Sequence, residues 1–138
     1  MKKKESSIKN IILTLLFISF YSNLYAGLEP KREPVYQCAN LNLDSDVYGA
    51  TIYSSQFGNA PNFYEIRVRY FENGYETSYI KKVNYIPYYN GMLEHFTTGN
   101  FRIKVDRVRS ANDGKYWAFA RIPSHNIHSM NWSCKDAQ

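Results

Sequence analysis

Apolar and polar residues alternate along much of the chain, most clearly in residues 63–71, FYEIRVRYF. This period of two, with β-branched and aromatic residues on one side, is typical of a strand with one buried face. Asn73-Gly74 follows the run and favours a two-residue hairpin, because both residue types tolerate positive φ. We therefore expect the chain to return as a second strand over residues 75–85.

Similar patterns predict strands over residues 35–43, 47–54, 101–109 and 115–122, and a short last strand around Trp132. In residues 101–109 the alternation loses phase, which predicts a β-bulge near Asp106-Arg107. Trp117 and Phe119 share one face of their strand, so we expect them in the core. No window has the apolar spacing of a helix. The sequence thus predicts an all-β fold, a small antiparallel barrel or sandwich of about six to eight strands.

The first 26 residues have the order of an export signal. Lysines at positions 2 to 4 precede an apolar run over residues 11–21, and the small residue Ala26 ends the segment. A membrane anchor is the weaker alternative, because a spanning helix needs about 20 apolar residues. We expect a signal peptide at residues 1–26, an extended lead-in at 27–34 and a single β domain at 35–138. The protein would be secreted or periplasmic, with no membrane span after cleavage.

The two cysteines, Cys38 and Cys134, lie near opposite ends of the predicted domain. Export would place them in an oxidising compartment, where thiols pair. A bond between them would close a loop of about 97 residues, which the chain-entropy model values at roughly 4–5 kcal/mol. It would also fasten the last strand to the first and keep the fold closed. The alternatives are a free thiol and an intermolecular bridge.

The positive charge of the chain belongs largely to the predicted signal. Of 17 Lys and Arg and 12 Asp and Glu, four cations and one acid lie in residues 1–26. The 13 cations and 11 acids that remain give a net charge of about +2. Nucleic-acid-binding domains carry a clustered excess of positive charge, so we expect no nucleic-acid partner.

Aromatic residues crowd one predicted turn, residues 84–91, NYIPYYNG. Tyr85, Tyr88 and Tyr89 lie there between turn-forming residues. Tyrosine offers a large contact area with a polar tip, which suits recognition. The alternative is that the rings fold back and cap one end of the core. We expect the loop to contact a protein or an envelope polymer.

Basic residues fall on the outward sides of two predicted strands. They are Arg67 and Arg69 on one strand, and Arg102 and Lys104 on another. If the two strands are neighbours, these side chains form a positive stripe that would attract an anionic polymer or an acidic partner. Acidic residues are interleaved with them, so the alternative is an ordinary solvated face whose ion pairs contribute little.

Catalytic patterns are missing from the sequence. It contains no nucleophile elbow, no zinc-protease helix motif and no phosphate-binding loop. His125 and His128, in HNIH, are weak candidates for a metal pair, because a site needs a third ligand at fixed geometry. We expect no enzymatic activity and no cofactor. A metal-dependent hydrolase using these histidines is the weakest alternative.

The order Tyr36-Gln37-Cys38, several strands and a terminal Cys134 resembles the layout of small periplasmic lysozyme inhibitors, which form an eight-stranded barrel. The resemblance covers the cysteine frame and the strand count. The Ser-Gly-x-Arg-Tyr loop that enters the lysozyme cleft does not occur here, and residues 98–102, TGNFR, do not match it. Our leading hypothesis is a non-enzymatic binding module that uses the aromatic loop. The resemblance implies, as an alternative, an inhibitor of a hydrolase such as lysozyme.

Overall fold

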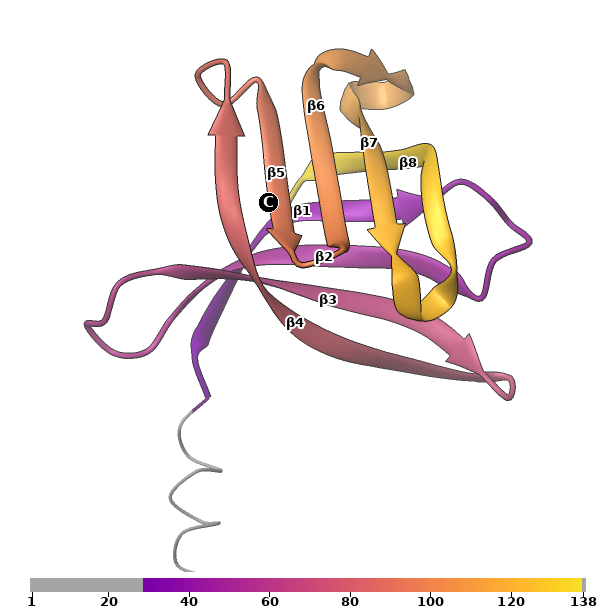
Figure 1. The fold of residues 1–138 in the computed structure, drawn as a ribbon, viewed down its shortest axis with the longest axis horizontal. Helices are drawn as coiled ribbons and strands as arrows, with labels where there is room; N and C mark the ends of the chain where they lie inside the picture. Colours follow the sequence, from indigo (N-terminus) through magenta and orange to yellow (C-terminus); the bar gives the residue numbers. More distant parts are fainter. Residues whose placement is uncertain (1–28, 138) are drawn as a thin grey trace, which may run out of the picture. The chain divides into compact units, whose positions relative to one another are not determined.

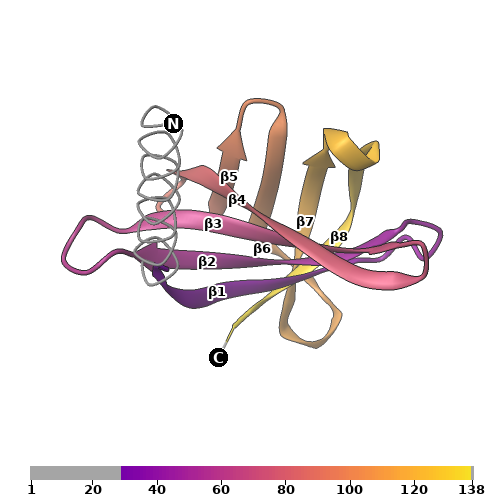
Figure 2. The same ribbon diagram turned by 90° about the horizontal axis from the view of Figure 1, so that it is seen from below.

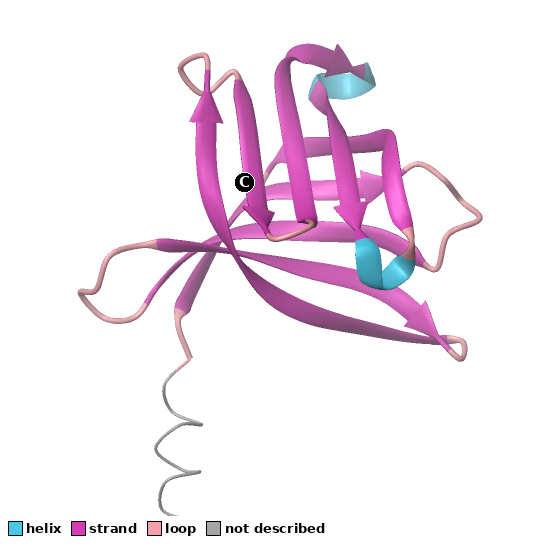
Figure 3. Cartoon of the chain, in the orientation of Figure 1, coloured by secondary structure: helices cyan, strands magenta, loops and turns pink. Residues whose placement is uncertain are grey.

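The computed structural model describes residues 29–137, in which eight antiparallel strands close into a barrel (Figure 1, Figure 3). The strands follow chain order around it: β1 Lys31–Asn40, β2 Val47–Gln56, β3 Phe63–Glu72, β4 Tyr75–Tyr88, β5 Leu93–Thr98, β6 Phe101–Ala111, β7 Lys115–Ile122 and β8 Ile127–Asp136. Single 3-10 turns, η1 Asn112–Gly114 and η2 Pro123–His125, flank β7. The predicted all-β fold is confirmed as a barrel. The predicted signal at residues 1–26 lies outside the described residues.

The chain divides into a unit of residues 1–31 and a unit that begins at Arg32 and contains nearly all of the barrel. Within the barrel, β5, β6 and β7 run across the long strands β2 and β3 (Figure 1, Figure 2). The two halves of the sheet therefore enclose one core between them. In residues 29–137 no helix is long and apolar enough to cross a membrane.

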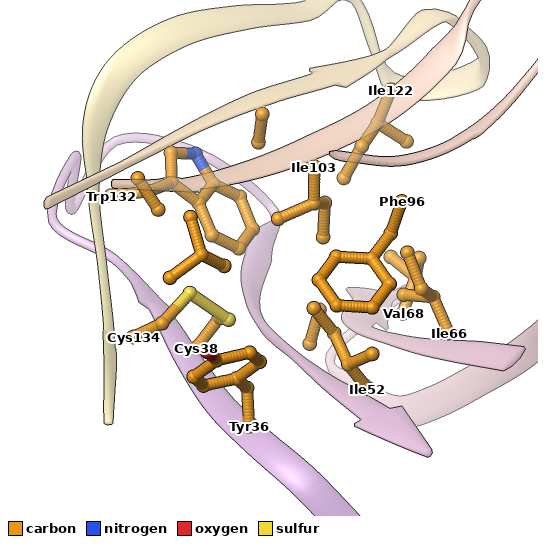
Figure 4. Close-up of a cluster of buried hydrophobic side chains, with 14 of the residues drawn as sticks. Tyr36, Cys38, Ile52, Ile66, Val68, Phe96, Ile103, Ile122, Trp132 and Cys134 are labelled. Atoms are coloured by element: carbon orange, nitrogen blue, oxygen red, sulfur yellow. A yellow bond between two sulfur atoms is a disulfide. The ribbon is translucent and has the colours of Figure 1, made fainter. Parts of the chain in front are cut away.

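The barrel closes where β8 pairs with β1. Cys38 lies directly opposite Cys134 in this register, and a disulfide joins them. The predicted covalent link between the first and last strands is confirmed, and neither cysteine is a free thiol. Figure 4 shows the bond between the rings of Tyr36 and Trp132, so the covalent link is part of the hydrophobic core.

Most of the strands form where the alternating pattern predicted them. The break of register between Asp106 and Ser110 confirms the predicted β-bulge. One strand was missed, β5, because its sequence LEHFTT has no apolar side. Glu94 and Phe96 face the barrel interior, and a buried carboxylate breaks the pattern that marks a strand.

The prediction that Trp117 and Phe119 belong to the core was wrong. The buried residues of β7 are Ala118, Ala120 and Ile122, while Trp117 remains 39% exposed and Phe119 half-buried on the outer side. The reason lies in β8: Ala118 pairs with Trp132, whose side chain is fully buried. The indole fills the space inside the barrel at this level, so small residues face it and the large rings of β7 point outward.

Candidate binding surface

The outer face of β5, β6 and β7 forms a regular grid of side chains, because these three strands pair in sequence order. Residues that pair across neighbouring strands point to the same side of a sheet. Three rows result: Leu93, Asp106 and Trp117 in the first; His95, Lys104 and Phe119 in the second; Thr97, Arg102 and Arg121 in the third. The grid therefore changes from apolar and aromatic at one end to basic at the other.

An open groove of about 900 Å³ lies over the aromatic part of this grid. We call it the outer groove; it is lined by Leu93, Lys104, Asp106, Arg109, Ser110, Trp117, Ala118, Phe119, His128 and Met130. The Phe119 ring is fixed from two sides: Lys104 Nζ lies 5.1 Å from its centroid, and the His128 ring meets it edge-on at 5.1 Å. Met130 is 69% exposed at the rim. The outer groove thus presents apolar surface to solvent on a rigid sheet.

The basic end of the grid keeps like charges together. Arg102 and Arg121 occupy directly opposed positions on β6 and β7, an arrangement that destabilises a sheet when both residues are charged. The ion pairs among residues 29–137 include neither of them, nor Lys104. The pKa of His95 is lowered from its ordinary value of 6.5 by burial and by the positive charges of Lys104 and Arg102. This part of the surface therefore has a positive potential.

Asp106, the acidic residue of the outer groove, accepts hydrogen bonds from the backbone of β6. Asp106 Oδ1 accepts hydrogen bonds from the backbone N–H groups of Val108, at 3.1 Å, and Arg109, at 3.3 Å. These bonds shape the bulge of β6, where the register with β7 breaks. Asp106 thus has a local structural role and is not ion-paired with the cations of the grid.

The predicted aromatic loop is divided between the interior and the surface. Tyr85 is half-buried, packs on Tyr64 and Phe96, and donates a hydrogen bond to Glu94. Tyr88 is the last residue of β4 and pairs with Leu93, which places it beside the outer groove. Tyr89 is 81% exposed in the turn, with a φ of 51°. Two of the three tyrosines therefore face solvent, and the third belongs to the barrel end.

The four predicted basic residues do not form one stripe, because β4 and β5 separate β3 from β6. On β3, Arg67 and Arg69 lie over the rings of Tyr53 and Tyr48. Arg69 also donates a 2.7 Å hydrogen bond to Thr51 on β2. The arginines of β3 are thus held by their neighbours, whereas Arg102 and Lys104 belong to the basic end of the grid.

The two histidines of HNIH have separate surroundings. His125 Nδ1 lies 3.0 Å from an oxygen of Asp46, and its ring contacts Tyr70 and Tyr79. His128 contacts Phe119 on the outer face. Within residues 29–137 no three His, Cys, Asp or Glu side chains are grouped so that they could hold a metal ion.

A second polar cluster, which the sequence patterns missed, lies at one end of the barrel. We call it the carboxylate–phenol network; its centre is Glu94, only 8% exposed. The Tyr36 hydroxyl donates to one carboxylate oxygen and the Tyr85 hydroxyl donates to the other, at 2.6 Å. Arg107 Nη1 lies 3.7 Å from Glu94 and donates a 2.8 Å hydrogen bond to Tyr36. Both oxygens accept a hydrogen bond, so the network connects the strands that carry these side chains.

The network extends to the last strand. Arg107 also approaches Asp136, at 3.6 Å, and Tyr116 donates a 3.0 Å hydrogen bond to the same carboxylate. Burial and the Glu94 carboxylate raise the pKa values of Tyr36 and Tyr85 above the ordinary value of 10. Their protons therefore stay in the hydrogen bonds at neutral pH. Six strands, β1, β4, β5, β6, β7 and β8, are tied together in this way.

Comparisons with protein-family models, with curated proteins and with solved structures gave no match to the chain. The sequence signal for the outer groove was present in β7, KYWAFARI, where the small residues and the rings alternate. If the small residues are assigned to the interior, the rings fall on the outer face.

Proposed function

We propose that the protein is a secreted or periplasmic, non-enzymatic binding module whose contact surface is the outer groove with its basic end. The partner is an extracellular or envelope component that carries negative charge. The observation that carries the proposal is the outward position of Trp117 and Phe119 on a sheet whose interior is already filled. The Cys38–Cys134 disulfide is consistent with an oxidising compartment.

Physical chemistry favours this surface over the rest of the barrel. Tryptophan dominates contact energies because it buries a large, rigid area at low cost in conformational entropy. Cations of the grid steer an anionic partner toward these rings. Tyr88 and Tyr89 lie at the neighbouring β4–β5 turn and extend the contact area.

The test compares the wild-type protein with a Trp117→Ser/Phe119→Ser variant in surface plasmon resonance against a panel of envelope polymers and secreted proteins. We expect at least tenfold weaker binding of the variant to any partner found, with the circular dichroism spectrum unchanged. Tyr75→Ser is the matched control, because Tyr75 is an exposed aromatic residue at the distant β3–β4 turn. Equal binding by wild type and groove variant, or no binding partner in the panel, contradicts the proposal.

The same variants test the alternative of hydrolase inhibition. Lysozyme and a set of proteases are titrated with the wild-type protein, and residual activity is measured. If the wild-type protein inhibits one of these enzymes and the Trp117→Ser/Phe119→Ser variant does not, the partner of the outer groove is that hydrolase. Inhibition that the groove variant keeps would place the functional surface elsewhere and contradict the proposal.

A further inference from the structure

We propose that the outer groove and its basic end bind an acidic polysaccharide, one whose sugar rings carry carboxylate groups. This inference rests on the proposed function, since it names the partner class of the same surface. Sugar rings would pack on Trp117 and on the exposed part of Phe119, whose ring lies between Lys104 and His128. Their carboxylates would pair with Arg102, Lys104 and Arg121.

The spacing of the grid fits such a ligand. Phe119 and Arg121 are two residues apart on β7 and face the same side, so their Cα atoms lie about 6.5–7 Å apart. A pyranose ring with a carboxylate substituent presents an apolar face of C–H bonds and a negative charge within one sugar residue. Lys104, which lies over the Phe119 ring, can reach the same group. One uronic acid thus satisfies an aromatic and a basic position together.

The charges also favour an anionic ligand. Opposed arginines on neighbouring strands cost stability, and the ion pairs among the described residues leave Arg102 and Arg121 out. Bound carboxylates would remove this repulsion. Asp106, the acid of the outer groove, is turned into the backbone of the bulge and does not compete for the arginines.

A protein partner fits the surface less well. A peptide that adds a strand needs an unpaired sheet edge, and the eight described strands pair in a closed ring. The cores of protein interfaces are depleted in charged residues, especially lysine. The outer groove instead contains Lys104 and Asp106 among its rings. An extended polymer that lies across an open, shallow surface is the better match.

The experiment uses the full chain, expressed with its N-terminal segment so that the cell processes it. Isothermal titration calorimetry compares four probes. Polygalacturonate has sugar rings and carboxylates, dextran has uncharged sugar rings, and polyglutamate has carboxylates without sugar rings. Single-stranded polythymidylate is the nucleic-acid probe. We expect polygalacturonate to bind at least tenfold more tightly than each of the others. Binding should weaken with added salt, because exposed charges are screened.

Two variants separate the contributions of rings and charge. Arg102→Gln/Arg121→Gln should weaken polygalacturonate binding at least tenfold and reduce its salt dependence. Trp117→Ala/Phe119→Ala should weaken it similarly and leave the salt dependence unchanged. Arg67→Gln/Lys82→Gln is the matched control, because it removes the same charge from β3 and β4; it should bind within twofold of wild type.

The outcomes distinguish this inference from the proposed function. One outcome is that polyglutamate or polythymidylate binds as tightly as polygalacturonate, with binding weakened in both the arginine and the aromatic double variant. That result overturns the assignment of the ligand as a polysaccharide and leaves the proposed binding surface in place. Equal binding of dextran overturns the role of charge. If the arginine and the aromatic double variant both bind every probe as the wild type does, the inference and the proposed function fail together.

Discussion

Replacing Glu94 by alanine should remove a large part of the stability of the barrel. The carboxylate accepts hydrogen bonds from Tyr36 and Tyr85, and each bond to a charged group contributes about 1.5–3 kcal/mol. The ion pair with Arg107 adds less than about 1 kcal/mol, because the guanidinium is 36% exposed. Glu94→Ala should therefore lower the free energy of unfolding by about 3–6 kcal/mol, most of it from the two bonds to the phenols. A typical domain is stable by about 5–15 kcal/mol, so this loss is a large fraction of the total.

The conservative variant Glu94→Gln keeps the shape and one acceptor oxygen, so its loss should be about 1–2 kcal/mol. Urea unfolding with the disulfide intact, followed by tryptophan fluorescence, to which the buried Trp132 contributes, measures both values. A double-mutant cycle with Tyr85→Phe should give a coupling of about 1–2 kcal/mol. Glu76→Ala on the exposed β3–β4 hairpin is the control and should change stability by less than about 0.5 kcal/mol.

If Glu94→Ala lowers the free energy of unfolding by no more than the Glu76→Ala control does, the stabilising role of the Glu94 carboxylate is refuted. It is also refuted if the cycle with Tyr85→Phe shows no coupling, since the two residues would then act independently. A large loss with no coupling would mean that the cavity, not the hydrogen bonds, determines the cost of the truncation.

Further predictions concern the covalent link and the titrating groups. Reduction of the Cys38–Cys134 disulfide, or replacement of both cysteines by serine, should lower the free energy of unfolding by about 4–5 kcal/mol, because 96 positions separate the two cysteines. Equal urea midpoints with and without reductant would contradict this. The raised pKa values of Tyr36, Tyr64 and Tyr85 mean that their stabilisation is fully present below pH 10 and is lost as pH rises above it, by about 1.4 kcal/mol per pH unit for each phenol. Tyr85→Phe should therefore reduce the slope by about 1.4 kcal/mol per pH unit, and an unchanged slope would count against the network. Lys104→Gln should raise the lowered pKa of His95 toward 6.5 in an NMR titration, and no change would remove the evidence for uncompensated charge.

The alternation of residues determines most of the fold because it reflects which side of each strand is buried. It predicted β3, β7 and the bulge of β6, and the two cysteines predicted the closure. It could not predict β5, where Glu94 faces the interior. A buried carboxylate is tolerated there because phenols from β1 and β4 donate hydrogen bonds to it and Arg107 of β6 lies beside it. Such partners come from distant parts of the sequence, and their meeting is a property of the closed barrel.

The candidate surface was partly predictable for the same reason. Arg102 and Lys104 were assigned to an outward face, where the structure places them. The prediction for Trp117 was the core, because it shares one strand face with Phe119 and aromatic residues suit a half-buried sheet surface. The choice between the two faces of β7 depends on Trp132, which fills the barrel opposite Ala118. Only the pairing of β7 with β8 decides which set of β7 side chains is left outside.

Aromatic side chains lie both inside the barrel and on its outer face, so substitutions can change stability and binding separately. Truncation of a fully buried ring, such as Phe96 or Trp132, costs about 3–5 kcal/mol because it leaves a cavity. Trp117 is partly solvated already, so its truncation should cost little stability. The disulfide and the carboxylate–phenol network meanwhile fix the strands that carry the outer rings. A surface held in this way loses little conformational entropy on binding, which is the physical reason for expecting contacts on the strands rather than in the β4–β5 turn alone.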